Sequence, residues 1–195
     1  MLLETNARPD KAIPIENIDF YLCPKCATNT IRYCQYVYSG GTKNISDFRD
    51  DDTSTGAIRG YKLLHLQHGE VKYNKERTDS IKVAVVRDPV ERFTSSLQWI
   101  NYKYNLSLTL EQALEQSEKD IHLLTQSHFY GNDSSKYNYI INPNEITSLI
   151  KKITGRDLGV VHKGRNPRPI SFSISKEMSN LISSHYKVDY DNGYC

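Results

Sequence analysis

The chain has 195 residues, a length at which one folded domain with a single hydrophobic core is expected. Its net charge of +2 is too small to indicate a general nucleic-acid binder. No apolar run approaches the ~18 to 20 residues needed to cross a bilayer, and residues 1–12 contain no hydrophobic signal-peptide core. We therefore expect no membrane span, and either a cytoplasmic chain or a soluble domain cut from a longer protein.

The first informative segment is a predicted strand-to-helix junction near the start of the chain. Ile18–Cys23 is apolar and aromatic like a buried strand, and Pro24 ends it. Lys25 then lies at the exit of the strand, and residues 28–30 offer hydroxyl and amide groups where a helix would begin. The free amides and dipole of a helix N-terminus favour anions. The segment lacks the Gly-x4-Gly-Lys-Ser/Thr spacing of nucleoside triphosphate sites, so a shorter phosphate-binding loop fits better.

The four cysteines, Cys23, Cys26, Cys34 and Cys195, do not form a metal-binding set. Cys23 and Cys26 have the C-x2-C spacing, but no second pair and no nearby His-x3-His follow. A thioredoxin-like redox role for this pair is a minor alternative. We expect buried or partly buried thiols in a reducing compartment.

A second junction is predicted in the middle of the chain. Ile81–Val86 is a continuous apolar run, typical of a central parallel strand. Arg87 follows it, Asp88 is a plausible N-cap, and Pro89 suits the first helical position. The core-facing stripe of the helix is predicted to be Val90, Phe93, Leu97 and Ile100, and Arg92, Ser95 and Trp99 lie off it. Two such junctions imply a ligand with more than one phosphate-like group.

Other elements are predicted with less bearing on function. Ser39–Gly60 is expected to be a surface excursion, disordered or in contact with substrate, and Ile58–Leu64 the second strand. Amphipathic helices are predicted at Leu106–Glu118, Asn142–Ile153 and Ser175–Tyr186. The fold class we expect is α/β, a three-layer P-loop-like domain with a mostly parallel central sheet and helices on both faces, spanning residues 1–195.

The two junctions together resemble sulfotransferases that use 3′-phosphoadenylyl sulfate, most closely the carbohydrate-type branch. Pro24–Thr30 resembles their 5′-phosphosulfate loop, and Arg87–Arg92 with Ser95 resembles their 3′-phosphate site. Lys163-Gly164-Arg165, followed by Pro167, looks like the loop that closes over the nucleotide. Three further segments resemble the family more weakly and follow in the expected order along the chain: Thr125–Phe129, Tyr137–Ile150 and Tyr186–Tyr194. The sequence departs from the family in having Ala27 where many members have glycine, and in its small size.

The resemblance implies a function and a set of site residues. The function is transfer of a sulfuryl group from 3′-phosphoadenylyl sulfate (PAPS) to a hydroxyl of a carbohydrate or carbohydrate-like acceptor, with no metal expected. Lys25 is the implied group that stabilises the charge on the leaving oxygen. The implied nucleotide-binding residues are Lys25, Ala27, Thr28, Asn29, Thr30, Arg87, Ser95, Lys163, Gly164 and Arg165.

A general base for the acceptor hydroxyl is expected among the histidines. His65 and His68 follow the predicted strand Ile58–Leu64, and so fall near the end of the sheet. The family resemblance favours His65 by spacing, with His68 as the alternative and Glu70 and His128 as outside candidates. Two other functions stay open: a small nucleotide or metabolite kinase of related fold, and a catalytically inactive nucleotide-binding module.

Overall fold

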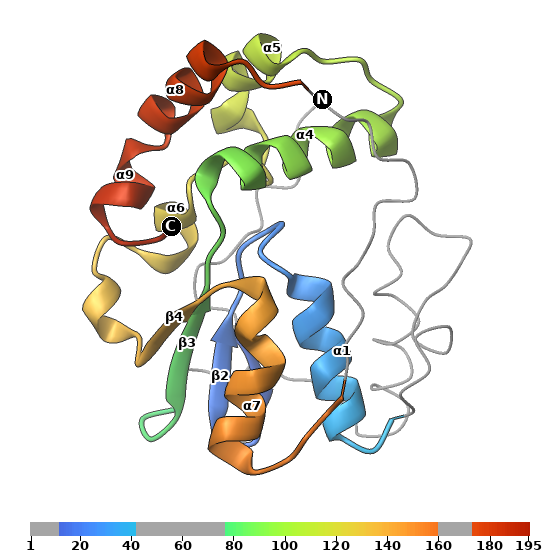
Figure 1. Cartoon of the computed structure of the whole chain (residues 1–195), viewed down its shortest axis with the longest axis vertical. Coiled ribbons are helices and arrows are strands. Elements are labelled where there is room, and N and C mark those ends of the chain that lie inside the picture. Colours follow the sequence, from blue (N-terminus) through green and yellow to red (C-terminus); the bar gives the residue numbers. More distant parts are fainter. Residues whose placement is uncertain (1–11, 42–76, 160–172) are drawn as a thin grey trace.

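The computed structural model of the protein describes residues 12–41, 77–159 and 173–195. Within these ranges one four-stranded sheet has the order β1-β2-β3-β4 (Figure 1). Its strands are β1 (Ala12–Ile15), β2 (Ile18–Tyr21), β3 (Ile81–Val85) and β4 (Tyr139–Ile141). β1 and β2 are antiparallel, whereas β2, β3 and β4 run parallel. The prediction of a mixed α/β protein with a mostly parallel sheet is confirmed.

The register of the two central strands brings the predicted junctions together. Ile18 pairs with Ile81, and Tyr21 pairs with Ala84. Because parallel strands in matched register end at the same edge of a sheet, the segments that follow β2 and β3 leave the sheet side by side. This edge carries the candidate site.

One face of the sheet is covered by two helices, α1 (Thr28–Tyr38) and α7 (Ile146–Thr154) (Figure 1). Alternate strand residues such as Phe20, Val83 and Val85 point to this face and pack with apolar residues of both helices. The predicted apolar face of α7, with Ile146, Leu149 and Ile150, is buried there. A short 3₁₀ turn (Pro143–Glu145) precedes α7.

The opposite face is covered by segments that the sequence analysis did not predict as helices. The helix α6 (Gln126–Tyr130) and the C-terminal segment with α9 (Lys187–Asp191) lie near the carboxyl ends of the strands. Phe129, Tyr130 and Tyr194 form a second core cluster with strand residues Tyr21 and Ala84. The Tyr130 hydroxyl also donates a hydrogen bond to the carbonyl of Val85, at 2.6 Å.

The long helix α4 (Pro89–Tyr104) belongs to a third cluster beyond the carboxyl edge of the sheet (Figure 1). It packs with α5 (Leu110–Glu115) and α8 (Lys176–His185). The predicted stripe is correct, because Phe93, Leu97 and Ile100 are buried. The partners of this stripe are the helices α5 and α8, so the stripe faces a helical cluster rather than the sheet.

Local signals placed the starts of α1, α4 and α8 correctly. Asp88, Thr109 and Ser175 cap α4, α5 and α8 through their side chains. α5 begins at Leu110, not at the predicted Leu106, because the capping box of Thr109 and Gln112 fixes its first turn. Three elements were not predicted: β1, α6 and α9. Two further 3₁₀ turns are Ser117–Lys119 and Ser134–Lys136.

The strand Ile58–Leu64 and all but the first three residues of the excursion Ser39–Gly60 lie outside the described residues. Among the helices that the structure describes, each is too short or too polar to span a bilayer.

Candidate functional site

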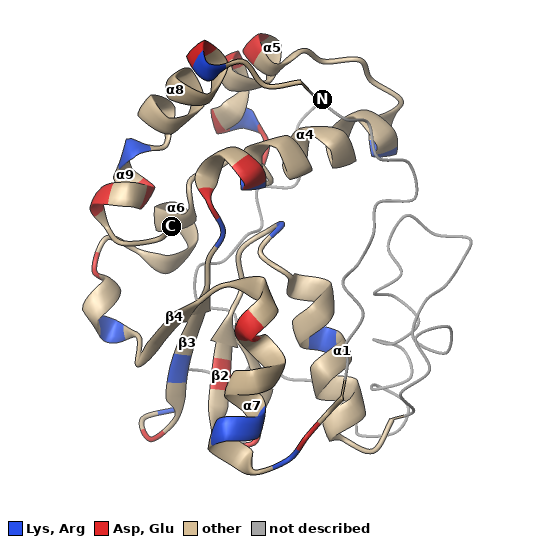
Figure 2. Cartoon of the chain, viewed as in Figure 1, with Lys and Arg blue, Asp and Glu red and all other residues tan. Residues whose placement is uncertain are grey.

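The two strand-to-helix junctions meet at the carboxyl edge of the sheet and each carries a cation. Figure 2 shows basic residues at the loop between β2 and α1 and at the link from β3 to α4. Lys25 belongs to the first segment and Arg87 to the second. The charge of Arg87 contributes to lowering the pKa of Lys25, so the two cations act on one region of space.

The first junction leaves the N-terminus of α1 without a side-chain cap. Lys25 and Ala27 both adopt left-handed backbone conformations, with φ of 66° and 63°, and the Cys26 amide donates to the Cys23 carbonyl at 3.2 Å. The Thr28 hydroxyl donates back to the same carbonyl at 3.2 Å. No side-chain hydrogen bond caps the helix at Ala27. The amides of the first turn, residues 28–30, have no acceptor among the described residues, and they stand where an anion would be favoured.

Lys25 is held in a setting that disfavours its own charge. Burial, and then the nearby charge of Arg87, lower the pKa of Lys25 to about 8. Its Nζ lies 5.6 Å from the centroid of the Trp99 ring, a cation–π arrangement. In the described part of the chain no carboxylate pairs with Lys25. An anionic ligand would supply the missing counter-charge.

The second junction is capped by its own carboxylate. Asp88 Oδ1 accepts hydrogen bonds from the amides of Val90 and Glu91, both at 3.0 Å, and Pro89 occupies the first helical position. Arg87 Nε donates to Glu91 at 3.2 Å. No described residue accepts a hydrogen bond from the Nη groups of Arg87, so these donors are available to a ligand as far as the described residues are concerned. Ser95, eight residues later on α4, is half-buried.

Arg92 has a structural position that the helical pattern did not indicate. It was placed off the buried stripe, but it is fully buried. Its guanidinium donates to the carbonyls of Pro24 at 3.5 Å and His122 at 3.3 Å, and also to the carbonyl of Leu124. Arg92 therefore ties the loop that carries Lys25 to the segment before α6, and does not face a ligand.

Gln126 is a second buried connector, and sequence reasoning missed its role. Its amide group accepts from the backbone N–H of Arg87 and the thiol of Cys26, and donates to the carbonyls of Arg87 and Tyr194. The buried carboxylate of Asp189 accepts from the amides of Gln126 and Ser127, both at 2.8 Å. In the sequence, Thr125–Phe129 and Tyr186–Tyr194 showed only a weak resemblance to the family. In the structure these two segments contact each other, and through Gln126 they connect both junctions to the C-terminus.

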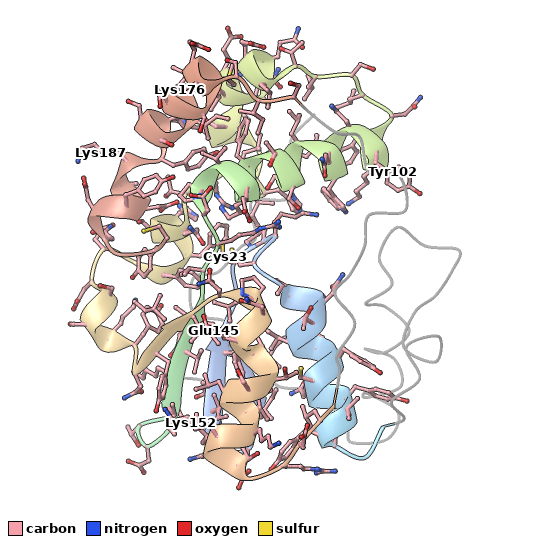
Figure 3. All side chains as sticks on the ribbon, viewed as in Figure 1. Cys23, Tyr102, Glu145, Lys152, Lys176 and Lys187 are labelled. Atoms are coloured by element: carbon pink, nitrogen blue, oxygen red, sulfur yellow. The ribbon has the colours of Figure 1, made fainter. Side chains whose placement is uncertain are left out.

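Cys23 and Cys26 lie inside this region, and Figure 3 shows Cys23 beneath α4. Burial and the hydrogen bond with Cys26 raise the pKa of Cys23. Burial opposes ionisation of Cys26 as well, but the hydrogen bond with Cys23 and the charges of Arg92 and Arg87 lower its pKa. Cys34 is buried, as expected, whereas Cys195 is exposed. Among the described residues no group of His, Cys, Asp and Glu could hold a metal ion.

The predicted site residues divide into two sets. The structure brings Lys25, Ala27, Thr28, Asn29 and Thr30 to the same edge of the sheet as Arg87. Ser95 is half-buried on α4, and no described contact joins it to Arg87 or Lys25. The base candidates His65, His68 and Glu70 and the loop Lys163, Gly164 and Arg165 lie outside the described residues. His128, an outside candidate, is exposed on α6.

Comparison of the chain with protein-family models, with curated proteins and with solved structures finds no match. The fold and site by themselves define a mixed α/β protein with two cationic strand-to-helix junctions at one sheet edge.

Proposed function

We propose that this protein transfers a sulfuryl group from PAPS to a hydroxyl of a carbohydrate or carbohydrate-like acceptor, and that its fold is P-loop-like. The observation that carries the proposal is the convergence of Lys25, Arg87 and the uncapped first turn of α1. Each of these features favours an anion, and they come from two separate junctions. The motif resemblance of the same two segments to sulfotransferases supplies the identity of the anion.

The residues present fit the two ends of such a nucleotide. The amides of Thr28, Asn29 and Thr30, with Lys25, would bind the 5′-phosphosulfate. The Nη groups of Arg87, which bond none of the described residues, would bind the 3′-phosphate together with the Ser95 hydroxyl. Lys163, Gly164 and Arg165 are proposed to complete the 3′-phosphate site.

Sulfuryl transfer, like phosphoryl transfer, depends mainly on positioning and on stabilising developing charge. Lys25 is suited to the leaving oxygen for a physical reason. Its charged form is disfavoured in the free protein, so the stabilisation it gains from a developing negative charge beside it is large. The backbone conformation that aims it is fixed by the left-handed residues Lys25 and Ala27.

The decisive experiment is a binding screen of the purified protein with 3′-phosphoadenosine 5′-phosphate (PAP), ATP and GTP, with and without magnesium, by thermal shift and calorimetry. A ligand at ~100 times its dissociation constant should stabilise the fold by about 2.7 kcal/mol. We expect PAP alone to do so, without magnesium. Stabilisation by ATP only with magnesium would instead favour the kinase alternative.

Two variants locate the 3′-phosphate. Arg87→Ala should weaken PAP binding, and Arg87→Lys should also weaken it, because lysine cannot make a forked contact. Lys187→Ala, on the exposed side of α9, is the matched control and should bind like the parent. If a folded Arg87→Ala protein binds PAP as tightly as the parent, the assignment of Arg87 is wrong.

A further inference from the structure

A histidine–aspartate pair lies beside the candidate site on a segment that the sequence did not single out. His122 Nδ1 is 2.9 Å from Asp120 Oδ1, and the His122 amide donates to the same oxygen at 2.8 Å. The Asp120 side chain is 5% exposed and the His122 side chain 22% exposed. The carboxylate is thus sheltered, while the imidazole can be reached by a substrate.

The tautomer of His122 follows from its partner. Burial opposes ionisation of Asp120, but the hydrogen bonds from the ring and amide of His122, with the charge of Lys103, lower the pKa of Asp120. An ionised carboxylate can only accept hydrogen bonds, so the proton of neutral His122 resides on Nδ1. Its Nε2 then carries a free lone pair, and no described residue bonds it.

Trp99 joins this pair to the candidate site. The rings of Trp99 and His122 lie 4.0 Å apart between centroids, at 34°. The same indole is contacted by Lys25 Nζ at 5.6 Å and by Lys103 Nζ at 4.5 Å. His122 and Lys25 therefore both contact one aromatic side chain of α4.

The backbones of the two segments are also fixed to each other. One guanidinium nitrogen of Arg92 donates to both the His122 carbonyl and the Pro24 carbonyl. The Ser96 hydroxyl donates to the His122 carbonyl as well, at 2.6 Å. The imidazole is held by its carboxylate, its ring neighbour and its backbone, as a preorganised group requires.

We propose that His122 is the general base that takes the proton of the acceptor hydroxyl, with Asp120 and Trp99 as positioning residues. This inference rests on the proposed sulfuryl transfer. The acceptor oxygen forms its bond to sulfur while its proton passes to His122 Nε2. The bond from sulfur to the bridging oxygen breaks, and that oxygen keeps the electron pair beside Lys25. In-line transfer needs the base and the cation on opposite sides of sulfur, so they must share a site without touching each other.

The first test is steady-state turnover with PAPS and a mixture of desulfated heparin and chondroitin as acceptor probes. His122→Ala should lower kcat by at least about 100-fold, and free imidazole should restore part of the loss. Asp120→Asn should also lower kcat, because an amide no longer selects the Nδ1–H tautomer. Both variants should bind PAP like the parent, since the base acts on the acceptor. His185→Ala, an exposed histidine on α8 that bonds only Ser117 among the described residues, is the matched control and should retain full activity.

The second test does not depend on turnover. Long-range ¹⁵N–¹H NMR of the parent protein should show His122 protonated at Nδ1 and unprotonated at Nε2, and Asp120→Asn should change that pattern. The opposite tautomer in the parent overturns the proposal.

The outcomes separate the two proposals. If the parent transfers sulfate and His122→Ala is equally active, the base is not His122 and the role returns to His65 or His68. If the parent neither binds PAP nor sulfates any probe, the proposed function fails, and the role of His122 fails with it. Loss of activity in His122→Ala without imidazole rescue, together with weaker PAP binding, would show a structural role only.

Discussion

The two strand-to-helix junctions differ in how the first turn of the helix is satisfied. At β3–α4 the Asp88 carboxylate accepts the free amides, and Pro89 removes one donor. At β2–α1 none of the described side chains caps the helix, and two left-handed residues shape the turn before it. The second junction can offer a ligand only side chains, whereas the first also offers backbone amides. Two ends of one nucleotide can therefore be bound by different chemistry at one sheet edge.

Because the first junction is assigned to the reacting sulfate, we expect the largest loss of activity when Lys25 is replaced. Lys25→Met should reduce sulfuryl transfer by roughly 10²- to 10³-fold, the usual cost of losing one group that stabilises developing charge. Its melting temperature should not fall, because burial and Arg87 already disfavour this charge in the folded protein. Turnover and thermal unfolding measured on the same samples check both parts. A matched Lys187→Met variant should leave both unchanged.

Arg92 holds the loop of the first junction to α4 of the second, and its loss should weaken the fold. Arg92→Leu leaves the carbonyls of Pro24, His122 and Leu124 without this donor, and should lower the free energy of unfolding by about 3 kcal/mol. Urea unfolding measures the change. Thr94→Val, on the same helix, loses only bonds to its own helix carbonyls and should cost far less. Equal stability of the two variants would contradict the role of Arg92 in connecting the loop of Pro24 to α4 and the segment of His122.

The affinity for PAP should depend on pH through Lys25. In the ligand-free protein the pKa of Lys25 is about 8, and an anion bound beside Lys25 must raise this pKa. Binding should therefore be tightest below pH 8 and weaken up to about tenfold per pH unit above it. Calorimetry between pH 7 and pH 9.5 measures this slope. Lys25→Arg should be nearly independent of pH in this range, and a parent that shows no slope would place the charge of Lys25 away from the ligand.

Removing the Asp88 cap of α4 tests whether only the amides of α1, and not those of α4, bind the nucleotide. Asp88→Ala should lower the free energy of unfolding by about 1 kcal/mol, because two amides of α4 lose their acceptor. Asp88→Asn keeps an acceptor and should cost less. PAP affinity, measured alongside, should change little, since the amides assigned to the ligand belong to α1. A large loss of affinity with an intact fold would show that both helix ends bind the nucleotide.

The smallest effect is expected at Ala27. A left-handed conformation costs a residue with a Cβ atom roughly 1–2 kcal/mol, of which glycine recovers part. Ala27→Gly should raise the free energy of unfolding by about 0.5 kcal/mol and leave PAP binding intact. Ala27→Val should be destabilising. Unfolding midpoints of the three proteins give the order, and a less stable glycine variant would mean that the turn is not strained.

Local chemistry determined the parts that sequence reasoning predicted correctly. The apolar runs that became β2 and β3, the Asp88 cap with Pro89, and the Ser175 cap depend on neighbours within a few residues. Such features can be predicted from local sequence because strand burial and helix capping are short-range effects. The same signals placed Lys25 just beyond a strand, although β2 ends at Tyr21, two residues before the predicted Cys23, so Lys25 lies in the loop between β2 and α1.

Tertiary structure decided which residues meet at the edge of the sheet. Arg92 is predicted off the apolar stripe of α4, but it is buried, because the loops containing Pro24 and His122 bring carbonyls to it from 68 and 30 residues away. α4 packs on α8, not on the sheet, because Ile182 and Tyr186 complete its apolar stripe. Helical periodicity shows which face is apolar but not what covers it. For the same reason no local pattern could place His122 against Trp99, since that contact exists only once α4 and the segment before α6 have packed together.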